Sequence, residues 1–286
     1  MSNNLNLIKD LREKTGAGFL DCKQALNETN ENIEQAVDFL RKKGLAKASK
    51  KSSREAKEGA IGIYFNNKLS VLIKVNSETD FAAKSDVFLN FIDFLGKAAL
   101  DVNSINLNKE KFLNTEYKNK LIAEHFNDMI SKIGENIILN DIIFMDNNKN
   151  NFNYYVHNSY RKNIGKIISF LQYSSNKNDD EIIKLSKNIC MHIAALKPEA
   201  IDSDSLDQKV IDREINIQKE LISSSGKPAN VIEKILEGKM KKFFSEVTLM
   251  NQKYIIVPEK TIKEVIESYS NDRSFELISF KLMILN

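Results

Sequence analysis

Residues 60–84 read AIGIYFNNKLSVLIKVNSETDFAAK, and within them the hydrophobic pattern is that of β-strands. Two β-rich runs, Ala60–Phe65 and Leu69–Asn76, flank the polar residues Asn66-Asn67-Lys68, which is typical of a β-hairpin. Ser85 follows directly, and it can cap a helix whose apolar residues recur every third or fourth position. The pattern predicts an antiparallel hairpin, a turn and then an amphipathic helix.

The same order of elements recurs further along the chain. Residues 167–171 repeat the strand pattern of 71–75, and Ala194-Ala195-Leu196 repeats Ala98-Ala99-Leu100 at the same offset. The turns differ, since the first copy has an aromatic residue beside a carboxylate, Asp80-Phe81, and the second does not. A shared scaffold does not require that pair, so Asp80 and Phe81 are candidates for a function.

Spacing alone leaves two interpretations of this turn open. Thr79 or Asp80 can cap the helix while Phe81 packs inward, and spacing favours this arrangement. Alternatively, Phe81 is exposed beside Asp80 and contacts another molecule.

Before the hairpin, residues 1–44 predict a module of three short helices. A Gly-containing loop, Thr15–Gly18, separates the first two, and Asn32 followed by Gln35 is a capping-box pattern for the third. Gly44 is expected to end the third helix. The polar, basic segment 45–58 then predicts a linker, with a domain boundary near residue 55.

After the hairpin, the pattern alternates between helices and strands. Residues 101–135 look helical with polar interruptions, and strands are expected at 136–145, 154–157 and 164–171. A helix is expected to stop before Pro198, and residues 203–247 predict two helices broken at Ser223–Gly226, with Pro228 starting the second. A strand at 247–258 and a helix and strand at 260–286 complete the pattern, and each of the three prolines is expected to mark the end of an element.

The chain is therefore expected to be an α+β protein with an N-terminal three-helix module, a core of two related β-hairpin-plus-helix subdomains with antiparallel sheets, and an inserted helical hairpin. The expected parts are residues 1–55, 56–140, 141–202, 203–247 and 248–286.

Composition excludes several classes of protein. The 42 Lys and Arg residues nearly balance 39 Asp and Glu, and the net charge of +3 argues against strong nucleic-acid binding. No transmembrane run and no secretory signal are visible, and Cys22 and Cys190 form no short-range pair, so the cytoplasm is the expected compartment. The three histidines have no partner at helical spacing, and no phosphate-binding glycine loop or nucleophile motif occurs, so we expect no metal, no cofactor and no enzyme activity of these common classes.

The N-terminal loop carries a second candidate surface. Residues 11–23, LREKTGAGFLDCK, expose Phe19 and Leu20 between the cationic residues Arg12 and Lys23 if the apolar pair does not complete the core. An apolar knob with cationic flanks suits docking on a protein groove with an acidic rim.

These two stretches, in this order, resemble the translation elongation factor Ts family of bacteria and organelles. The resemblance covers nearly the whole chain and is supported by further matching segments: Ile133–Asn136, Met191–Ala195, Lys197–Glu199, Ser225–Pro228 and Glu237–Lys242. It implies a guanine-nucleotide exchange factor for elongation factor Tu, which it binds in the GDP-bound and nucleotide-free forms. It also implies that the N-terminal module is similar to ubiquitin-associated domains.

The resemblance assigns roles by position. Arg12, Phe19, Leu20 and Lys23 would contact the partner's GTP-binding domain. Asp80 and Phe81 would intrude near the magnesium and phosphate site. His157, in a core-domain loop, and the apolar pair Ile255 and Ile256 would make further contacts, and residues 203–247 are a candidate dimerisation hairpin. Two extra residues are expected after His157, and the contact that a further C-terminal helix makes in some relatives is expected to be missing.

Two functions of other classes remain open on the residues alone. The basic run Arg41–Lys57 has eight cationic residues and one acidic residue, and it suits either a solvated linker helix or attraction to RNA and ribosomes. The N-terminal module could also serve an adaptor that binds ubiquitin-like proteins or helical peptides.

Overall fold

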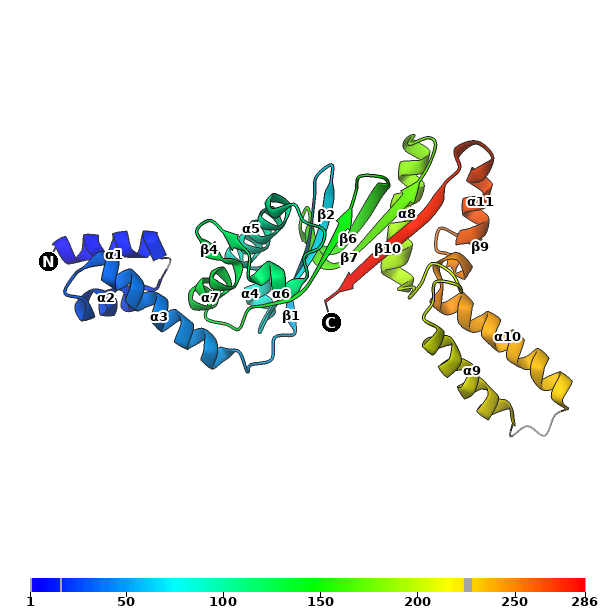
Figure 1. Ribbon diagram of the computed structural model, residues 1–286, viewed down its shortest axis with the longest axis horizontal. Coiled ribbons are helices and arrows are strands. Elements are labelled where there is room, and N and C mark those ends of the chain that lie inside the picture. Colours follow the sequence, from blue (N-terminus) through cyan, green and yellow to red (C-terminus); the bar gives the residue numbers. More distant parts are fainter. Residues whose placement is uncertain (1, 16, 224–227, 286) are drawn as a thin grey trace. The chain divides into compact units, whose positions relative to one another are not determined.

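The computed structural model describes residues 2–15, 17–223 and 228–285, and the chain divides into two compact units (Figure 1). The first unit contains Met1–Asn148, Asn158–Lys166 and Met283–Asn286, and the second contains Lys149–His157 and Ile167–Leu282. Both units combine helices with antiparallel strands, which confirms the α+β class. The finer division into five parts stays a prediction.

Three helices begin the first unit: α1 (Ser2–Thr15), α2 (Phe19–Glu28) and α3 (Ile33–Lys51). They share a small core, which is formed by Ile8, Leu11, Cys22, Ala25, Leu26 and Ala36. Asn32 caps α3, because its Oδ1 accepts a hydrogen bond from the Gln35 backbone N–H at 3.0 Å. The predicted module is confirmed, although Gly16 of the predicted loop lies outside the described residues.

The predicted end of the third helix at Gly44 is wrong. Helix α3 continues through Gly44 to Lys51, into the segment expected to be a linker. One glycine inside a helix costs only about 1 kcal/mol, and the following residues are mostly good helix formers. Packing of α3 against α7 (Ile122–Ile133) offsets that cost.

The predicted hairpin is formed by β1 (Glu58–Phe65) and β2 (Leu69–Ser77), which pair antiparallel from Glu58↔Ser77 to Phe65↔Ser70. Strand β5 (Ile138–Asp146) pairs with the other edge of β2, with a bulge at Lys74/Val75. On its free side, β1 pairs with the first residues of β7 (Ile164–Ser174).

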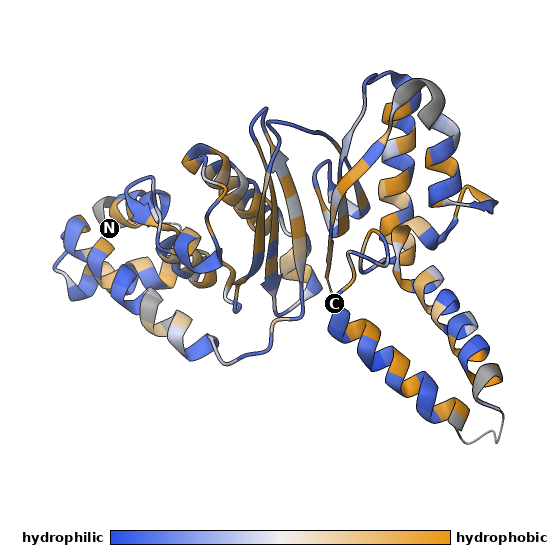
Figure 2. Cartoon of the chain, turned by 45° about the vertical axis from the view of Figure 1, so that its right-hand side comes forward, coloured by the Kyte–Doolittle hydropathy of each residue, from blue (hydrophilic) through white to orange (hydrophobic). Residues whose placement is uncertain are grey.

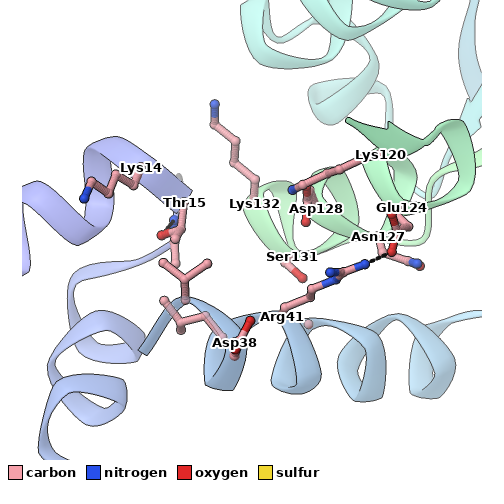
Figure 3. Close-up of a pocket in the computed structure, with 14 residues that line it drawn as sticks. Lys14, Thr15, Asp38, Arg41, Lys120, Glu124, Asn127, Asp128, Ser131 and Lys132 are labelled. Carbon is pink, nitrogen blue, oxygen red and sulfur yellow. Dashed lines mark hydrogen bonds and ion pairs between the residues drawn. The ribbon is translucent and has the colours of Figure 1, made fainter. Parts of the chain in front are cut away.

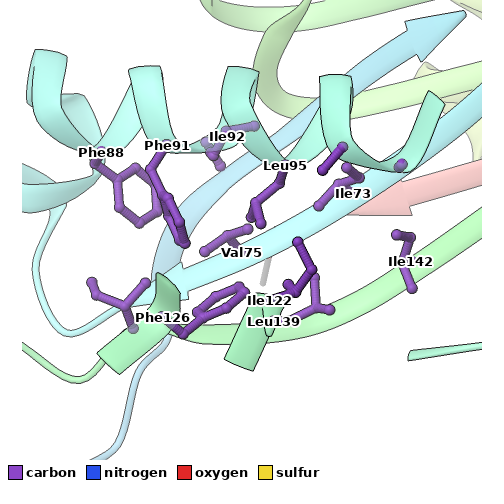
Figure 4. Packing of buried hydrophobic residues seen from close by; sticks show 14 of the residues in the cluster. Ile73, Val75, Phe88, Phe91, Ile92, Leu95, Ile122, Phe126, Leu139 and Ile142 are labelled. Atoms are coloured by element: carbon purple, nitrogen blue, oxygen red, sulfur yellow. The ribbon is translucent and has the colours of Figure 1, made fainter. Parts of the chain in front are cut away.

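Helix α5 (Asp86–Val102) packs on this hairpin, and Figure 4 shows its apolar side chains facing β2, β5 and α7. Ser85 caps it as predicted, since its Oγ accepts a hydrogen bond from the Phe88 N–H at 3.3 Å. The buried cluster includes Ile73, Val75, Phe88, Phe91, Ile92, Leu95, Ile122, Phe126, Leu139 and Ile142.

Residues 101–135 are less helical than expected. Between α6 (Lys109–Leu113) and α7 lies a small hairpin of β3 (Glu116–Tyr117) and β4 (Lys120–Leu121). Its turn residues Lys118 and Asn119 have positive φ angles of 52° and 63°, a conformation that hydrophobic periodicity does not reveal.

In the second unit, β7 pairs with β6 (Asn151–Arg161) and with β10 (Glu276–Ile284). Helix α8 (Asp180–Leu196) contributes to the same buried cluster as β7 and ends before Pro198, as predicted. The order strand, turn, helix is thus present in both predicted copies, as β2 with α5 and as β7 with α8.

The predicted helical hairpin consists of α9 (Gln208–Ser223) and α10 (Ala229–Val247), which pack against each other. Figure 2 shows hydrophobic and hydrophilic residues alternating along both helices. Pro228 lies at the N-cap of α10, as predicted, whereas the expected break at Ser224, Ser225 and Gly226 lies outside the described residues. Dimerisation through this hairpin stays a prediction.

The predicted strand at 247–258 is only partly formed. A 3₁₀ turn (Leu249–Asn251) precedes two short strands, β8 (Lys253–Tyr254) and β9 (Val257–Thr261), and α11 (Ile262–Arg273) follows. Pro258 lies inside β9 and does not end an element, so this prediction is wrong. A two-stranded sheet has open edges, where a proline need not break the hydrogen-bond ladder.

Candidate functional site

The corner between β2 and α4 (Asp80–Lys84) projects an aromatic ring into solvent. Thr79 caps α4, because its Oγ1 accepts a hydrogen bond from the Ala82 N–H at 3.2 Å. Ala82 and Ala83 face the core, whereas Phe81 is 84% exposed. The interpretation in which Phe81 packs inward is therefore wrong. The alanines make the contacts that the fold requires, and the ring is left free.

Asp80 lies beside the ring and carries a negative charge. Lys84, one helical turn later, donates a hydrogen bond to Asp80 Oδ2 at 2.8 Å. This hydrogen bond lowers the pKa of the Asp80 carboxyl below its usual value, and backbone N–H groups add to the effect. The corner thus presents an ionised carboxylate beside an apolar ring.

Two glutamates hold the backbone of this corner. Glu135 accepts hydrogen bonds from the Thr79 N–H at 3.0 Å and from the Thr79 hydroxyl at 2.6 Å. In the reverse direction, Glu78 Oε1 accepts a hydrogen bond from the Asn136 N–H at 2.6 Å. The residues Glu78-Thr79 after β2 are therefore joined to Glu135-Asn136 before β5 by one carboxylate from each segment.

The chain leaving α3 is tied to the same place. The Arg54 guanidinium lies 3.4 Å from Glu78 Oε2, and the buried Asn136 side chain donates to the Arg54 carbonyl at 2.7 Å. Lys51 donates a hydrogen bond to the Gly134 carbonyl. Asn136 thus connects the segment after α3 to the corner, through its side chain and its backbone N–H.

The N-terminal knob is also exposed. Phe19 and Leu20 open α2 and are 43% and 78% exposed, while Cys22 on the next turn is buried. Arg12 and Lys23 are both exposed. Together with Leu5, Ile8 and Ala17, Arg12 and Phe19 line a shallow cleft of about 480 Å³. Of the two interpretations of this loop, the structure favours an exposed apolar pair over a completed core.

Several cations of the basic run Arg41–Lys57 are paired with carboxylates of the same chain. Arg41 pairs with Glu124, Lys43 with Asp21 at 2.9 Å, and Lys57 with Glu55 at 2.7 Å. Arg54 and Lys51 are engaged at the corner. A face that neutralises phosphates needs unpaired cations, so these contacts do not favour RNA binding by this run.

In the second unit, Ile255 and Ile256 form the turn between β8 and β9. They are 40% and 48% exposed, and Val257 beside them is 37% exposed. The Ile255 N–H donates to Nδ1 of the buried His192 at 3.3 Å, and His192 Nε2 lies 2.9 Å from Gln252 Oε1. Burial lowers the pKa of His192, so the neutral imidazole supports the turn.

His157 is exposed, as a contact residue would be, but the expectation that it lies in a loop is wrong. It belongs to strand β6, which pairs with β7 and continues to Arg161, beyond the end expected at His157. The Tyr155 hydroxyl lies 3.1 Å from His157 Nδ1. Asn158, directly after it, has a positive φ of 50°, which marks the irregularity at this point.

A cavity of about 210 Å³ lies between α3 and α7 (Figure 3). Its lining has four cations, Lys14, Arg41, Lys120 and Lys132, and three carboxylates, Asp38, Glu124 and Asp128. The Arg41–Glu124 pair crosses it, and Lys120 lies 2.6 Å from Asp128. Such balanced charges are suited to joining helices rather than to holding an anion.

Within residues 2–15, 17–223 and 228–285, no group of His, Cys, Asp and Glu residues is arranged to hold a metal ion. Over the same residues, no helix has the length and hydrophobicity needed to cross a bilayer.

Comparison with known proteins identifies the family. The family model for elongation factor Ts matches residues 78–285. The chain belongs to the elongation factor Ts family. The elongation factor Ts of Rickettsia typhi is 40% identical over 271 residues, which is 94% of this chain and 87% of that protein. The elongation factor Ts of Ehrlichia ruminantium is 38% identical over 289 residues, which is 100% of both chains.

Family membership makes the protein a translation elongation factor and confirms the resemblance found in its sequence. The roles of single residues stay predictions. Glu78 and Glu135 were not among the residues predicted to form the site. A signal for Glu135 was present, because it belongs to the matching segment Ile133–Asn136, but the sequence gives no indication of the residue that it contacts.

Proposed function

We propose that this protein binds elongation factor Tu in its GDP form and accelerates GDP release. Asp80 and Phe81 enter beside the partner's magnesium and phosphate site, displace the backbone that holds the phosphates and weaken magnesium coordination. The observation that carries the proposal is the 84% exposure of Phe81 on a corner that is braced on both sides. Family membership supports the choice of partner.

The free energy needed for GDP release indicates that several contacts contribute to the acceleration. A thousandfold faster release requires about 4 kcal/mol off the barrier. One desolvated aromatic anchor contributes roughly 2–4 kcal/mol to an interface. Phe81 therefore needs help from contacts that hold the complex together, for which the exposed pairs Phe19-Leu20 and Ile255-Ile256 are the best candidates. Arg12, Lys23 and His157 are exposed and add polar contacts.

Such an exchange factor catalyses no covalent reaction. By linkage, GDP and this protein must weaken each other's binding to the partner by the same factor. The protein needs no cofactor in this mechanism, because a conformational change in the partner releases the nucleotide.

The test is release of labelled GDP from purified elongation factor Tu, with and without this chain. We expect release to accelerate with protein concentration and to saturate. An unchanged release rate at saturating protein would contradict the proposal. Parallel binding assays with RNA and with ubiquitin-like proteins test the two other functions, and tight binding there without faster GDP release would favour one of them.

A further inference from the structure

We infer that Glu135 is a positioning residue that fixes the direction in which Phe81 points. The inference rests on the proposed function, since it assigns Glu135 to the same exchange step. Glu135 reaches the corner from the segment after α7, and both of its carboxylate oxygens are used, one by the Thr79 N–H and one by the Thr79 hydroxyl.

The corner gains from an external tether because α4 is short and its buried side chains are the small residues Ala82 and Ala83. It has five residues, Asp80–Lys84, and the first turn of an isolated helix is unfavourable. Phe81 adds little packing, since most of its ring is exposed. Thr79 caps this helix through its hydroxyl, and its carbonyl accepts a hydrogen bond from the Ser77 hydroxyl at 3.0 Å. By holding Thr79, Glu135 sets both the start and the direction of the helix.

Two carboxylates connect the two segments in opposite directions. Glu135 binds the residue after Glu78, and Glu78 binds the residue after Glu135. A single hydrogen bond would permit rotation about itself, whereas two bonds in opposite directions resist both rotation and sliding. The backbone under Phe81 is thus held to β2 on one side and to the start of β5 on the other.

Rigidity matters for a wedge. A mobile ring would lose conformational freedom on insertion, and that cost would subtract from the free energy available to deform the partner. A ring on a fixed backbone has less of this freedom to lose, so less free energy is spent on ordering. Glu135 therefore acts on the step that displaces the nucleotide more than on the stability of the free protein.

The effect on folding is expected to be small. Thr79 is exposed and Glu135 is half-buried, so water can replace the lost hydrogen bonds when the carboxylate is removed. If loss of Glu135 leaves the free energy of unfolding nearly unchanged but lowers the rate of GDP release, its role is not merely structural.

The first experiment measures maximal GDP release at saturating protein for Glu135→Ala, Glu135→Gln, Phe81→Ala and the double variant. We expect Glu135→Ala to lower the maximal rate roughly tenfold, with less change in half-saturation, as is typical for the loss of hydrogen bonds to a charged group. Glu135→Gln keeps an oxygen for the Thr79 N–H and an amide for its hydroxyl, so it should retain most of the rate. The double variant should be no slower than Phe81→Ala, since Glu135 acts through the ring.

Asp101→Ala is the matched control. Asp101 also accepts a hydrogen bond from a hydroxyl, that of Tyr117 at 2.7 Å, but it lies near the far end of α5. Its loss removes the same kind of contact in the same unit, and exchange should stay at the wild-type rate.

The second experiment observes the ring without the partner. The chain contains no tryptophan, so Phe81→Trp introduces a single indole at the corner. Its fluorescence anisotropy decay should show a larger fast component when Glu135→Ala is added, and little change with Glu135→Gln or Asp101→Ala.

The outcomes separate the two proposals. If the wild-type chain leaves GDP release unchanged, the proposed function fails, while the anisotropy still tests the tether. If the wild-type chain is active and Phe81→Ala is slow but Glu135→Ala matches wild type, the inference about Glu135 is overturned. Equal indole mobility with and without the Glu135 carboxylate would also overturn it.

Discussion

The buried imidazole of His192 accepts a hydrogen bond at Nδ1 from the Ile255 N–H and thereby supports the exposed turn that Ile255 and Ile256 form. Its other nitrogen faces Gln252, whose amide donates to the Glu246 carbonyl at 2.7 Å. A residue inside α8 thus holds a surface turn more than sixty positions away in the chain.

This relationship predicts a pH dependence of stability. Burial lowers the folded-state pKa of His192 below that of the unfolded chain, so the unfolded state binds more protons in the window between the two pKa values. The free energy of unfolding should therefore be fully developed above the unfolded pKa of about 6.5 and should fall as pH drops toward the folded pKa. Urea unfolding at several pH values between 5 and 8 measures this slope.

His192→Gln is the comparison. It should destabilise the protein by about 1–3 kcal/mol at pH 7.5, because buried partners lose their hydrogen bonds. It should also reduce the slope of stability with pH below about 6.5. Identical slopes in the two proteins would show that His192 does not titrate on unfolding.

Phe88 and Phe81 form a matched pair that tests which ring contributes to the stability of the protein. Phe88 is completely buried and Phe81 is 84% exposed. Phe88→Ala should cost about 3–5 kcal/mol of unfolding free energy, the usual loss for a core phenylalanine. Phe81→Ala should change it by no more than about 0.5 kcal/mol. Chemical denaturation measures both, and a loss above 1 kcal/mol for Phe81→Ala would mean that the ring packs within its own protein.

Two helical glycines make a second matched pair. A Cβ added to Gly96 would lie 2.2 Å from the Tyr64 ring, whereas one added to Gly238 would meet nothing within 4 Å. Gly96→Ala should destabilise by roughly 1–3 kcal/mol through overpacking. Gly238→Ala should stabilise by about 0.5–1 kcal/mol through helix propensity. Thermal unfolding checks both signs, and stabilisation by Gly96→Ala would contradict the packing of α5 on β1.

The N-terminal knob should contribute affinity without stability. Leu20→Asp places a charge at a position that is 78% exposed, so the free energy of unfolding should stay within about 0.5 kcal/mol of wild type. Its affinity for elongation factor Tu should fall at least tenfold, because an apolar anchor is replaced by a charge. Calorimetric titration measures the affinity. The exposed Glu34→Ala on α3 serves as a control, and equal losses in both variants would remove Leu20 from the interface.

Local elements were predictable where short-range signals agree. The Asn66–Lys68 turn and the capping serine at position 85 predict the hairpin and α5, and both are present. Gly44 shows the limit of such signals. A glycine usually favours the end of a helix, but tertiary packing of α3 on α7 outweighs its propensity.

The arrangement of the site could not be predicted from the sequence. Whether Phe81 points inward or outward depends on which residues of α4 meet the core, and spacing alone favoured the wrong alternative. The partnership of Glu135 with Thr79 joins segments far apart in sequence, and no periodicity encodes it. Family resemblance supplied the identities of the exposed residues, whereas the contacts that hold them in place emerged only from the fold.

The most direct test of the central claim is the rate of fluorescent GDP release from elongation factor Tu with wild-type protein and with Phe81→Ala, each at saturating concentration. We predict that the variant loses at least about tenfold of the acceleration, as expected for loss of an aromatic anchor, while its unfolding free energy is preserved. A folded Phe81→Ala variant that releases GDP as fast as wild type would contradict the account.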